Sequence, residues 1–310
     1  MLNRKPFHTA DSTRFYHFKG YDSLWNLQRF HKGDAPHRKE NLVNDINQDK
    51  RITRRRLGQY AIDLPARDLS LLFDLEDCRH LTTGQIARLR FEEDHANPTA
   101  ALRAANRAVT RLKEMGLVAS LDRRIGGVRG GSGGLVWNLT AAGAKLVNLD
   151  SDTPPRRRNY EPTARFTDHT LAIAETYIQL LHISGVALTK AEFEPVCWRD
   201  YSGSTLKSDL FVITSDGEYE DYWFFEVDLA TETPQRIVAK CQQYEEYYLA
   251  GEEQKQHGLF PKVVWIAHNN KRCDSIRDHI AKGHELQHKS LFTVIMPDEL
   301  EALIRKGAGV

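Results

Sequence analysis

The sequence predicts an α/β protein with two domains, a helical module that ends in a β-hairpin and a following domain built on a mixed β-sheet. One reason is the order of helices and strands that the apolar pattern indicates, and another is the distribution of charge. Residues 1–158 carry 28 Lys and Arg against 18 Asp and Glu, whereas residues 159–310 carry 15 against 24. Between these halves, SDTPPRRRNYEP has the composition of a linker. The expected divisions are a basic arm over 1–65, the module over 66–150, the linker over 151–162 and the sheet domain over 163–310.

The composition limits the classes of protein that fit. No stretch approaches the roughly 18 consecutive apolar residues of a membrane span, and residues 1–18 lack the apolar run of a signal peptide. We therefore expect a cytoplasmic protein with no membrane partner. The four cysteines form no CxxC pair, and no Cys and His spacing suits a zinc site. The basic half points to a polyanionic partner and the acidic half to a divalent cation, with charge complementarity between the domains as the alternative.

The module over 66–150 shows three helical segments followed by two strands. The helices are predicted over 68–80, over 81–91 with Thr82 or Thr83 as N-cap, and over 100–118. In the third helix, spacings of three and four residues predict one buried stripe, made of Leu102, Ala105, Val109 and Leu112. The strands, over 117–125 and 135–147 with the second running into a short helix, are joined by the glycine-rich tip GGVRGGSGG. This order predicts an N-terminal winged helix-turn-helix.

In a winged helix the third helix enters the major groove and the wing lies against the DNA backbone or the minor groove. Arginines occur on both of these elements, and double-stranded DNA is therefore the expected partner. The candidate DNA-binding residues are Arg103, Arg107 and Arg111 on the helix, with Arg123, Arg124 and Arg129 on the wing. The alternative is that the module mediates protein contacts or dimerisation.

The acidic half shows the element order of a restriction-endonuclease-like fold, which is a helix, three strands, a helix and a strand, extended by a helix, a strand and a helix. The three strands are predicted over 187–200, 205–217 and 221–232, and the next helix over 233–251, with Thr233 as N-cap and Pro234 at its first position. The remaining elements are expected over 262–269, 273–283, 291–297 and 298–306.

Three carboxylates fall on neighbouring strands of this predicted sheet. Asp209 begins the apolar run of one strand, and Glu226 and Asp228 lie two residues apart on the next, so their side chains share a face. Crowded carboxylates repel one another unless a cation neutralises them. We therefore expect all three to act as ligands of Mg²⁺ or Mn²⁺, which would polarise a scissile phosphate and activate water.

The pattern D-x(16)-E-V-D resembles the PD-(D/E)xK nuclease motif, with Asp228 where that motif has lysine. The motif lysine orients the attacking water or supports the charged transition state, so its replacement puts hydrolysis in doubt. Two lysines could take its place. Lys207 precedes Asp209 on the same strand face, and Lys240 lies on the following helix, one turn from Tyr244.

The segment FFEVDLATETPQRIVAKCQQYEEYY, with His169 on an upstream helix, resembles the replication-relaxation family of plasmid and mobile-element proteins. The resemblance covers about residues 66–300. It implies a winged helix before a nuclease-like domain and a role in plasmid relaxation, mobilisation or replication, with the plasmid origin region as the DNA partner. It also implies functional positions at Asp209, Glu226, Asp228, Lys240, Tyr244 and His169.

Two hypotheses follow from these patterns. The first is a metal-dependent, relaxase-like enzyme that nicks DNA, and Tyr244, Tyr247 and Tyr248 leave a covalent mechanism open. The second is a non-catalytic DNA-binding regulator of plasmid replication or transfer, whose nuclease-like domain has degenerated. The retained carboxylates favour the enzyme, and the substituted lysine favours the regulator. The sequence also leaves a homodimer open.

Overall fold

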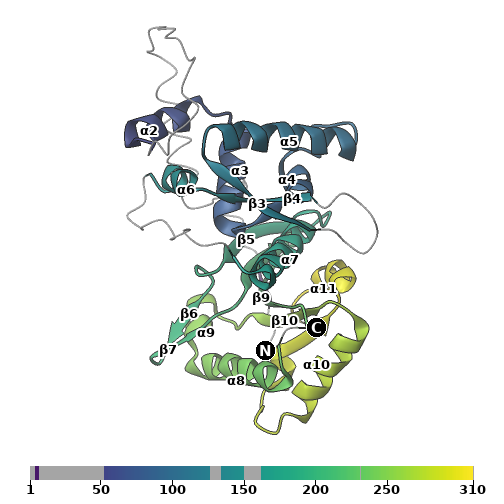
Figure 1. Ribbon diagram of the computed structural model, residues 1–310. Coiled ribbons are helices and arrows are strands. Elements are labelled where there is room, and N and C mark those ends of the chain that lie inside the picture. The colour runs from purple at the N-terminus through teal and green to yellow at the C-terminus, as the bar shows by residue number, and fades with distance from the viewer. Residues whose placement is uncertain (1–3, 7–51, 126–133, 150–161, 231, 310) are drawn as a thin grey trace, which may run out of the picture. The chain divides into compact units, whose positions relative to one another are not determined.

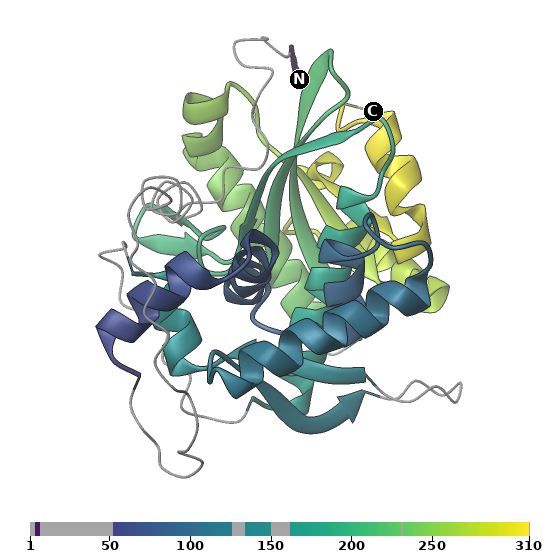
Figure 2. The ribbon, with the colours of Figure 1, turned by 90° about the horizontal axis from the view of Figure 1, so that it is seen from above.

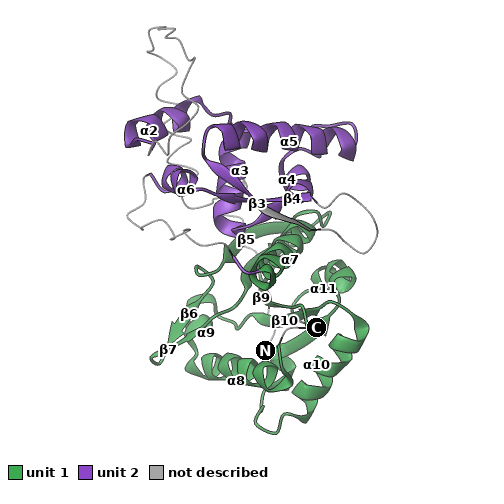
Figure 3. Ribbon diagram, in the orientation of Figure 1, with its two compact units in different colours: residues 1–16, 164–310 green, residues 17–163 purple. Residues whose placement is uncertain are grey.

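The computed structural model describes residues 4–6, 52–125, 134–149, 162–230 and 232–309 (Figure 1). The chain forms two compact units, residues 1–16 with 164–310 and residues 17–163 (Figure 3). Most of the expected arm, almost all of the expected linker and the wing residue Arg129 lie outside the described residues. The rest of the chain allows the predicted elements to be compared with the observed ones.

The unit over 17–163 contains the predicted order of three helices followed by a hairpin. Its elements are α2 (Arg54–Asp63), α3 (Ala66–Cys78), β2 (Leu81–Thr82), α4 (Thr83–Arg90), α5 (Pro98–Glu114), β3 (Val118–Ile125), β4 (Gly134–Leu139) and α6 (Ala141–Val147). The three strands form an antiparallel sheet in the order β2-β4-β3. Thr82 caps α4 as expected, with Gln85 completing a capping box. Helix α2, which contacts α6, lies inside the segment expected as an arm.

The buried face of α5 differs from the predicted stripe in one residue. Ala101, Ala105, Ala108 and Leu112 are buried, whereas Leu102 is 43% exposed, so its assignment to the stripe is wrong. Successive helical residues are about 100° apart, and Leu102 is therefore turned away from the stripe that its neighbour Ala101 begins. Helix α5 contacts α4, and four of its six buried residues are alanines.

The unit formed by 1–16 and 164–310 is a mixed sheet with helices on both faces, which confirms the α/β fold class. Its elements are β1 (Arg4–Pro6), α7 (Ala164–Leu181), β5 (Ala187–Phe193), β6 (Arg199–Tyr201), β7 (Ser204–Leu206), β8 (Leu210–Ser215), β9 (Tyr219–Asp228), α8 (Pro234–Ala250), α9 (Glu252–His257), β10 (Lys262–Ala267), α10 (Asn270–Lys282), β11 (Phe292–Ile295) and α11 (Leu300–Lys306). The twisted sheet has the order β11-β10-β9-β8-β5 (Figure 2).

The strand directions explain how distant segments meet in this sheet. Strands β9, β10 and β11 are parallel, whereas β5, β8 and β9 form an antiparallel meander. The first predicted strand, over 187–200, is too long: β5 ends at Phe193, and residues 199–206 form a separate hairpin, β6 with β7. Strand β1 pairs antiparallel with β9, which adds residues of the expected arm to the sheet.

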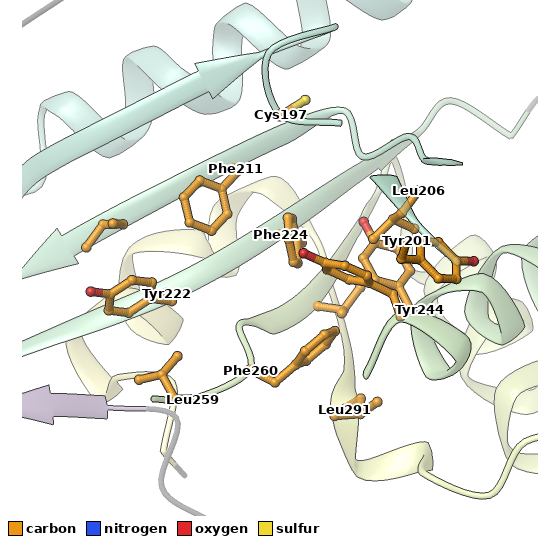
Figure 4. Close-up of a cluster of buried hydrophobic side chains, with 13 residues drawn as sticks. Cys197, Tyr201, Leu206, Phe211, Tyr222, Phe224, Tyr244, Leu259, Phe260 and Leu291 are labelled. Atoms are coloured by element: carbon orange, nitrogen blue, oxygen red, sulfur yellow. The ribbon is translucent and has the colours of Figure 1, made fainter. Parts of the chain in front are cut away.

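The helices form one layer on each side of the sheet, α7 with α11 and α8 with α10 (Figure 1). Helix α8 is anchored by two apolar clusters. One contains Tyr244 of α8 together with Phe211 and Phe224 of the sheet (Figure 4), and the other contains Ile237 and Cys241 of α8. This packing fixes the face of α8 that meets the sheet. Within the described residues, no helix is long and apolar enough to cross a membrane.

Candidate functional site

Asp209 and Glu226 meet at the junction of β8 and β9. Leu210 pairs with Phe225, and continuing this antiparallel register places Asp209 beside Glu226. The Oδ2 atom of Asp209 accepts a hydrogen bond of 2.8 Å from the backbone N–H of Val227, which fixes the orientation of the carboxylate. Asp209 is 8% exposed and Glu226 is 5% exposed. The structure therefore brings together two of the three predicted carboxylates at a nearly buried position.

Helix α8 supplies two side chains to Glu226, one helical turn apart. The Nζ atom of Lys240 lies 3.3 Å from Oε1 of Glu226, and the Tyr244 hydroxyl donates a hydrogen bond of 2.6 Å to the same oxygen. Lys240 also donates to the backbone carbonyl of Lys207. Of the two lysines considered as replacements for the motif lysine, Lys240 is therefore the one whose ammonium group lies beside Glu226.

Burial dominates the ionisation of Glu226. Desolvation raises its pKa to about 7, although the charge of Lys240 and the hydrogen bond from Tyr244 act in the opposite direction. Burial alone would lower the pKa of Lys240, but the carboxylates of Glu226 and Asp209 raise it above its usual value. Lys240 therefore stays protonated and provides a fixed positive charge beside the two carboxylates.

His169 on α7 completes the contacts of Asp209. Its Nε2 atom lies 3.2 Å from Oδ1 of Asp209. Burial alone would lower the pKa of His169, whereas its hydrogen bond and charge interaction with Asp209 raise it above the usual value. Glu194 contributes to the same field, because its charge raises the pKa of both His169 and Lys240. Sequence reasoning missed Glu194, because the strand predicted over 187–200 included this residue, whereas β5 ends at Phe193.

Asp228 is engaged by a different helix. The guanidinium of Arg272 on α10 binds both of its carboxylate oxygens, and Arg272 also donates a hydrogen bond of 2.7 Å to the carbonyl of Glu232. The side chain of Asp228 is fully buried in this ion pair. A carboxylate whose oxygens both accept from arginine is neutralised locally. Asp228 therefore holds α10 against the sheet in this structure.

The other predicted site residues lie away from the carboxylates or are enclosed. The Nζ atom of Lys207 lies 4.8 Å from the centre of the Trp198 ring. Tyr244 is fully buried, and burial raises its pKa well above the usual value. Tyr247 is buried and donates a hydrogen bond of 2.8 Å to Glu253. These positions make Tyr244 a hydrogen-bond support for Glu226 and not an accessible nucleophile.

The donor set near Asp209 suits a metal that takes few protein ligands. Within the described residues, no group of three or more His, Cys, Asp or Glu side chains is arranged to hold a metal ion. Mg²⁺ takes one or two carboxylates and completes its shell with water and phosphate oxygens. Both contacts of Glu226 are made through Oε1. Among the described residues, its Oε2 atom has no hydrogen-bond or ion-pair partner and is the oxygen left for a metal.

The solvent face of α5 is a second candidate site. Arg103 and Arg107 are exposed, whereas Arg111 forms an ion pair with Asp68, a buried residue of α3. An open depression of about 450 Å³ follows this face and is lined by Arg103, Asn106, Arg107, Thr110, Arg111 and Glu114. Of the predicted wing residues, Arg123 and Arg124 belong to β3, but their side chains lie outside the described part of the chain. The whole of Arg129 lies outside it as well.

Comparison with known proteins gave one match. A protein-family model described as Replication-relaxation matches residues 72–263, which is more than half of the chain. The matched region includes α5, Asp209, Glu226 and Lys240. No curated protein and no solved structure matches the chain.

Proposed function

This chain belongs to the replication-relaxation family, and we propose that it is a metal-dependent enzyme that binds DNA and nicks one strand. The family indicates a role in plasmid replication or transfer. Strand nicking is the chemistry that would start relaxation of a supercoiled plasmid. The substrate is double-stranded DNA of the plasmid origin region.

The observation that carries this proposal is the placement of Lys240 against the pair of carboxylates. The PD-(D/E)xK arrangement needs two acids and one cation. Here they are Asp209, just before β8, Glu226 on β9 and Lys240 on α8. In this proposal Lys240 of the helix replaces the motif lysine, because Asp228 occupies the usual lysine position and is bound to Arg272. The same chemical groups are thus available although one of them comes from another element.

Each side chain has a role that follows from its contacts. Mg²⁺ or Mn²⁺ would supply the charge that polarises a scissile phosphate and lowers the pKa of water. Asp209 and Glu226 would hold this cation, and His169 fixes the orientation of Asp209 through its 3.2 Å contact. The ammonium group of Lys240 stands within reach to orient the attacking water or to balance the charge that develops on phosphate. The hydrogen bond from the Tyr244 hydroxyl fixes the orientation of Glu226.

The unit over 17–163 is proposed to be the winged helix that brings DNA to this site. Its element order and its three-stranded sheet support that assignment, with α5 as the helix that enters the major groove. Arg103 and Arg107 present their charges to solvent on this helix, where they can contact phosphates.

A second candidate function is a non-catalytic DNA-binding regulator of plasmid replication or transfer. The observation in its favour is that Lys240 is engaged by both Glu226 and the carbonyl of Lys207. An ion pair of this kind also stabilises a fold without any chemistry. In this case the carboxylates would be remnants of a nuclease site.

The two functions are separated by nicking of a supercoiled plasmid that carries the protein's own origin. We expect the wild type to convert it to the open-circular form only with Mg²⁺ or Mn²⁺, and the Asp209→Asn variant to lose this activity. The Asp278→Asn variant is the matched control, because Asp278 is exposed on α10 and should nick like the wild type. A wild type that nicks no DNA with either metal would favour the regulator, and equal nicking by Asp209→Asn would place the active site elsewhere.

A further inference from the structure

The solvent face of α5 carries two chemically different rows of side chains. Residues four apart in a helix lie nearly above one another. One row contains the neutral residues Leu102, Asn106 and Thr110, and the adjacent row contains Arg103, Arg107 and Arg111. All six are exposed, whereas the opposite side of the helix is buried. A neutral row therefore runs beside a cationic row along one surface.

The C-terminal member of each row is already engaged by the protein. Arg111 binds Asp68, and the Thr110 hydroxyl donates a hydrogen bond of 2.8 Å to the backbone carbonyl of Asn106. Among the described residues, the side chains of Leu102, Asn106, Arg103 and Arg107 have no hydrogen-bond or ionic partner. The groups available to an external partner therefore extend from the first turns of α5 to its middle. In helix-turn-helix proteins the N-terminal part of the recognition helix contacts base edges.

The neutral row has the chemistry that distinguishes bases in the major groove. An asparagine amide offers one donor and one acceptor, which match N7 and N6 of adenine, and an apolar side chain contacts the methyl group of thymine. Four helical residues span about 6 Å along the axis, which is within two base-pair rises of about 3.4 Å. Leu102 and Asn106 can therefore face neighbouring base pairs at the same time.

We propose that Asn106 and Leu102 determine the DNA sequence that this protein prefers, with Asn106 reading an adenine and Leu102 reading the methyl group of a nearby thymine. The adjacent Arg103 and Arg107 contact phosphates and supply affinity for any sequence. The preferred site is then a duplex with A·T pairs at two positions separated by no more than two steps. This inference rests on the proposed function only in requiring that α5 binds duplex DNA.

The test is selection of preferred sites from a random duplex library by the full chain. We expect the wild type to enrich an adenine and a thymine at fixed positions, the Asn106→Ala variant to lose the adenine preference, and the Leu102→Ala variant to lose the thymine preference. On the preferred site each loss should be about tenfold in Kd, which corresponds to about 1.4 kcal/mol, with unchanged affinity for an unrelated duplex. Circular dichroism checks that the variants are folded.

The Arg107→Ala variant is the matched control on the same helix. It should weaken binding to every duplex by the same factor and reduce the dependence of affinity on salt. If Asn106→Ala and Leu102→Ala select the same sites as the wild type while Arg107→Ala weakens binding, the sequence-reading role is refuted and DNA binding by α5 stands. If the wild type binds no duplex at low salt, both the DNA-binding proposal and this inference are refuted.

Discussion

Replacing Glu226 by glutamine tests whether the carboxylate is buried as the structure describes. The Glu226→Gln variant keeps the size and shape of the side chain but cannot ionise. In the metal-free wild type, burial raises the pKa of Glu226 from 4.5 to about 7. At about 1.4 kcal/mol for each pH unit, this rise corresponds to a cost of about 3 kcal/mol for ionising Glu226 in the folded state.

The direction of the pH dependence follows from the raised pKa. The stability that protonated Glu226 contributes is complete below pH 4.5 and is lost as the pH rises through about 7. Glutamine resembles the protonated form at every pH. Glu226→Gln should therefore match the wild type near pH 4.5 and exceed it by about 3 kcal/mol in free energy of unfolding at pH 8.

The assay is urea denaturation in EDTA at several pH values between 4.5 and 8. The control is Glu218→Gln, which changes an exposed glutamate in the turn before β9. We expect the stability difference between Glu218→Gln and the wild type to stay constant over this range. A Glu226→Gln difference that is also independent of pH would refute the buried, costly carboxylate on which the proposed metal site depends.

Two further predictions concern Lys240 in the nicking reaction and Arg111 in the stability of the fold. Lys240→Ala should reduce plasmid nicking by about a hundredfold, the usual effect of losing one preorganised charged donor, without weakening DNA binding. Lys207→Ala should nick normally. Nicking by Lys240→Ala at the wild-type rate would exclude Lys240 from the reaction. Arg111→Ala should lower the free energy of unfolding by about 1 to 2 kcal/mol, because it leaves the buried Asp68 carboxylate unpaired. Arg103→Ala should leave the free energy of unfolding unchanged, and urea denaturation measures both variants. An equal loss of stability in both variants would refute the role of Arg111.

The sequence was informative where neighbouring residues on one element determine the geometry. The alternation along a strand and the pairing of β8 with β9 were sufficient to predict that Asp209 and Glu226 meet. The four-residue spacing on a helix likewise predicted that Lys240 and Tyr244 lie one turn apart, and both contact Glu226 in the structure. The α/β fold class could be predicted for the same reason, because helices and strands each have a characteristic spacing of apolar residues, and the structure confirms it.

The contacts between distant elements were beyond the reach of such patterns. Asp228 is bound by Arg272, 44 residues later, and Arg111 is bound by Asp68, 43 residues earlier. No local period marks either pair, because each depends on how two packed elements are brought together. Glu194 was missed for a related reason, since its closeness to His169 arises from the end of β5 and not from its spacing along the chain.

A crystal of the full chain soaked in Mn²⁺ shows whether Asp209 and Glu226 hold a divalent cation. We expect a peak of anomalous scattering between the two carboxylates, within coordination distance of their oxygens, and no peak at this place in the Asp209→Asn variant. A fully loaded crystal with Mn²⁺ bound elsewhere and none beside Asp209 and Glu226 would refute the proposed metal site.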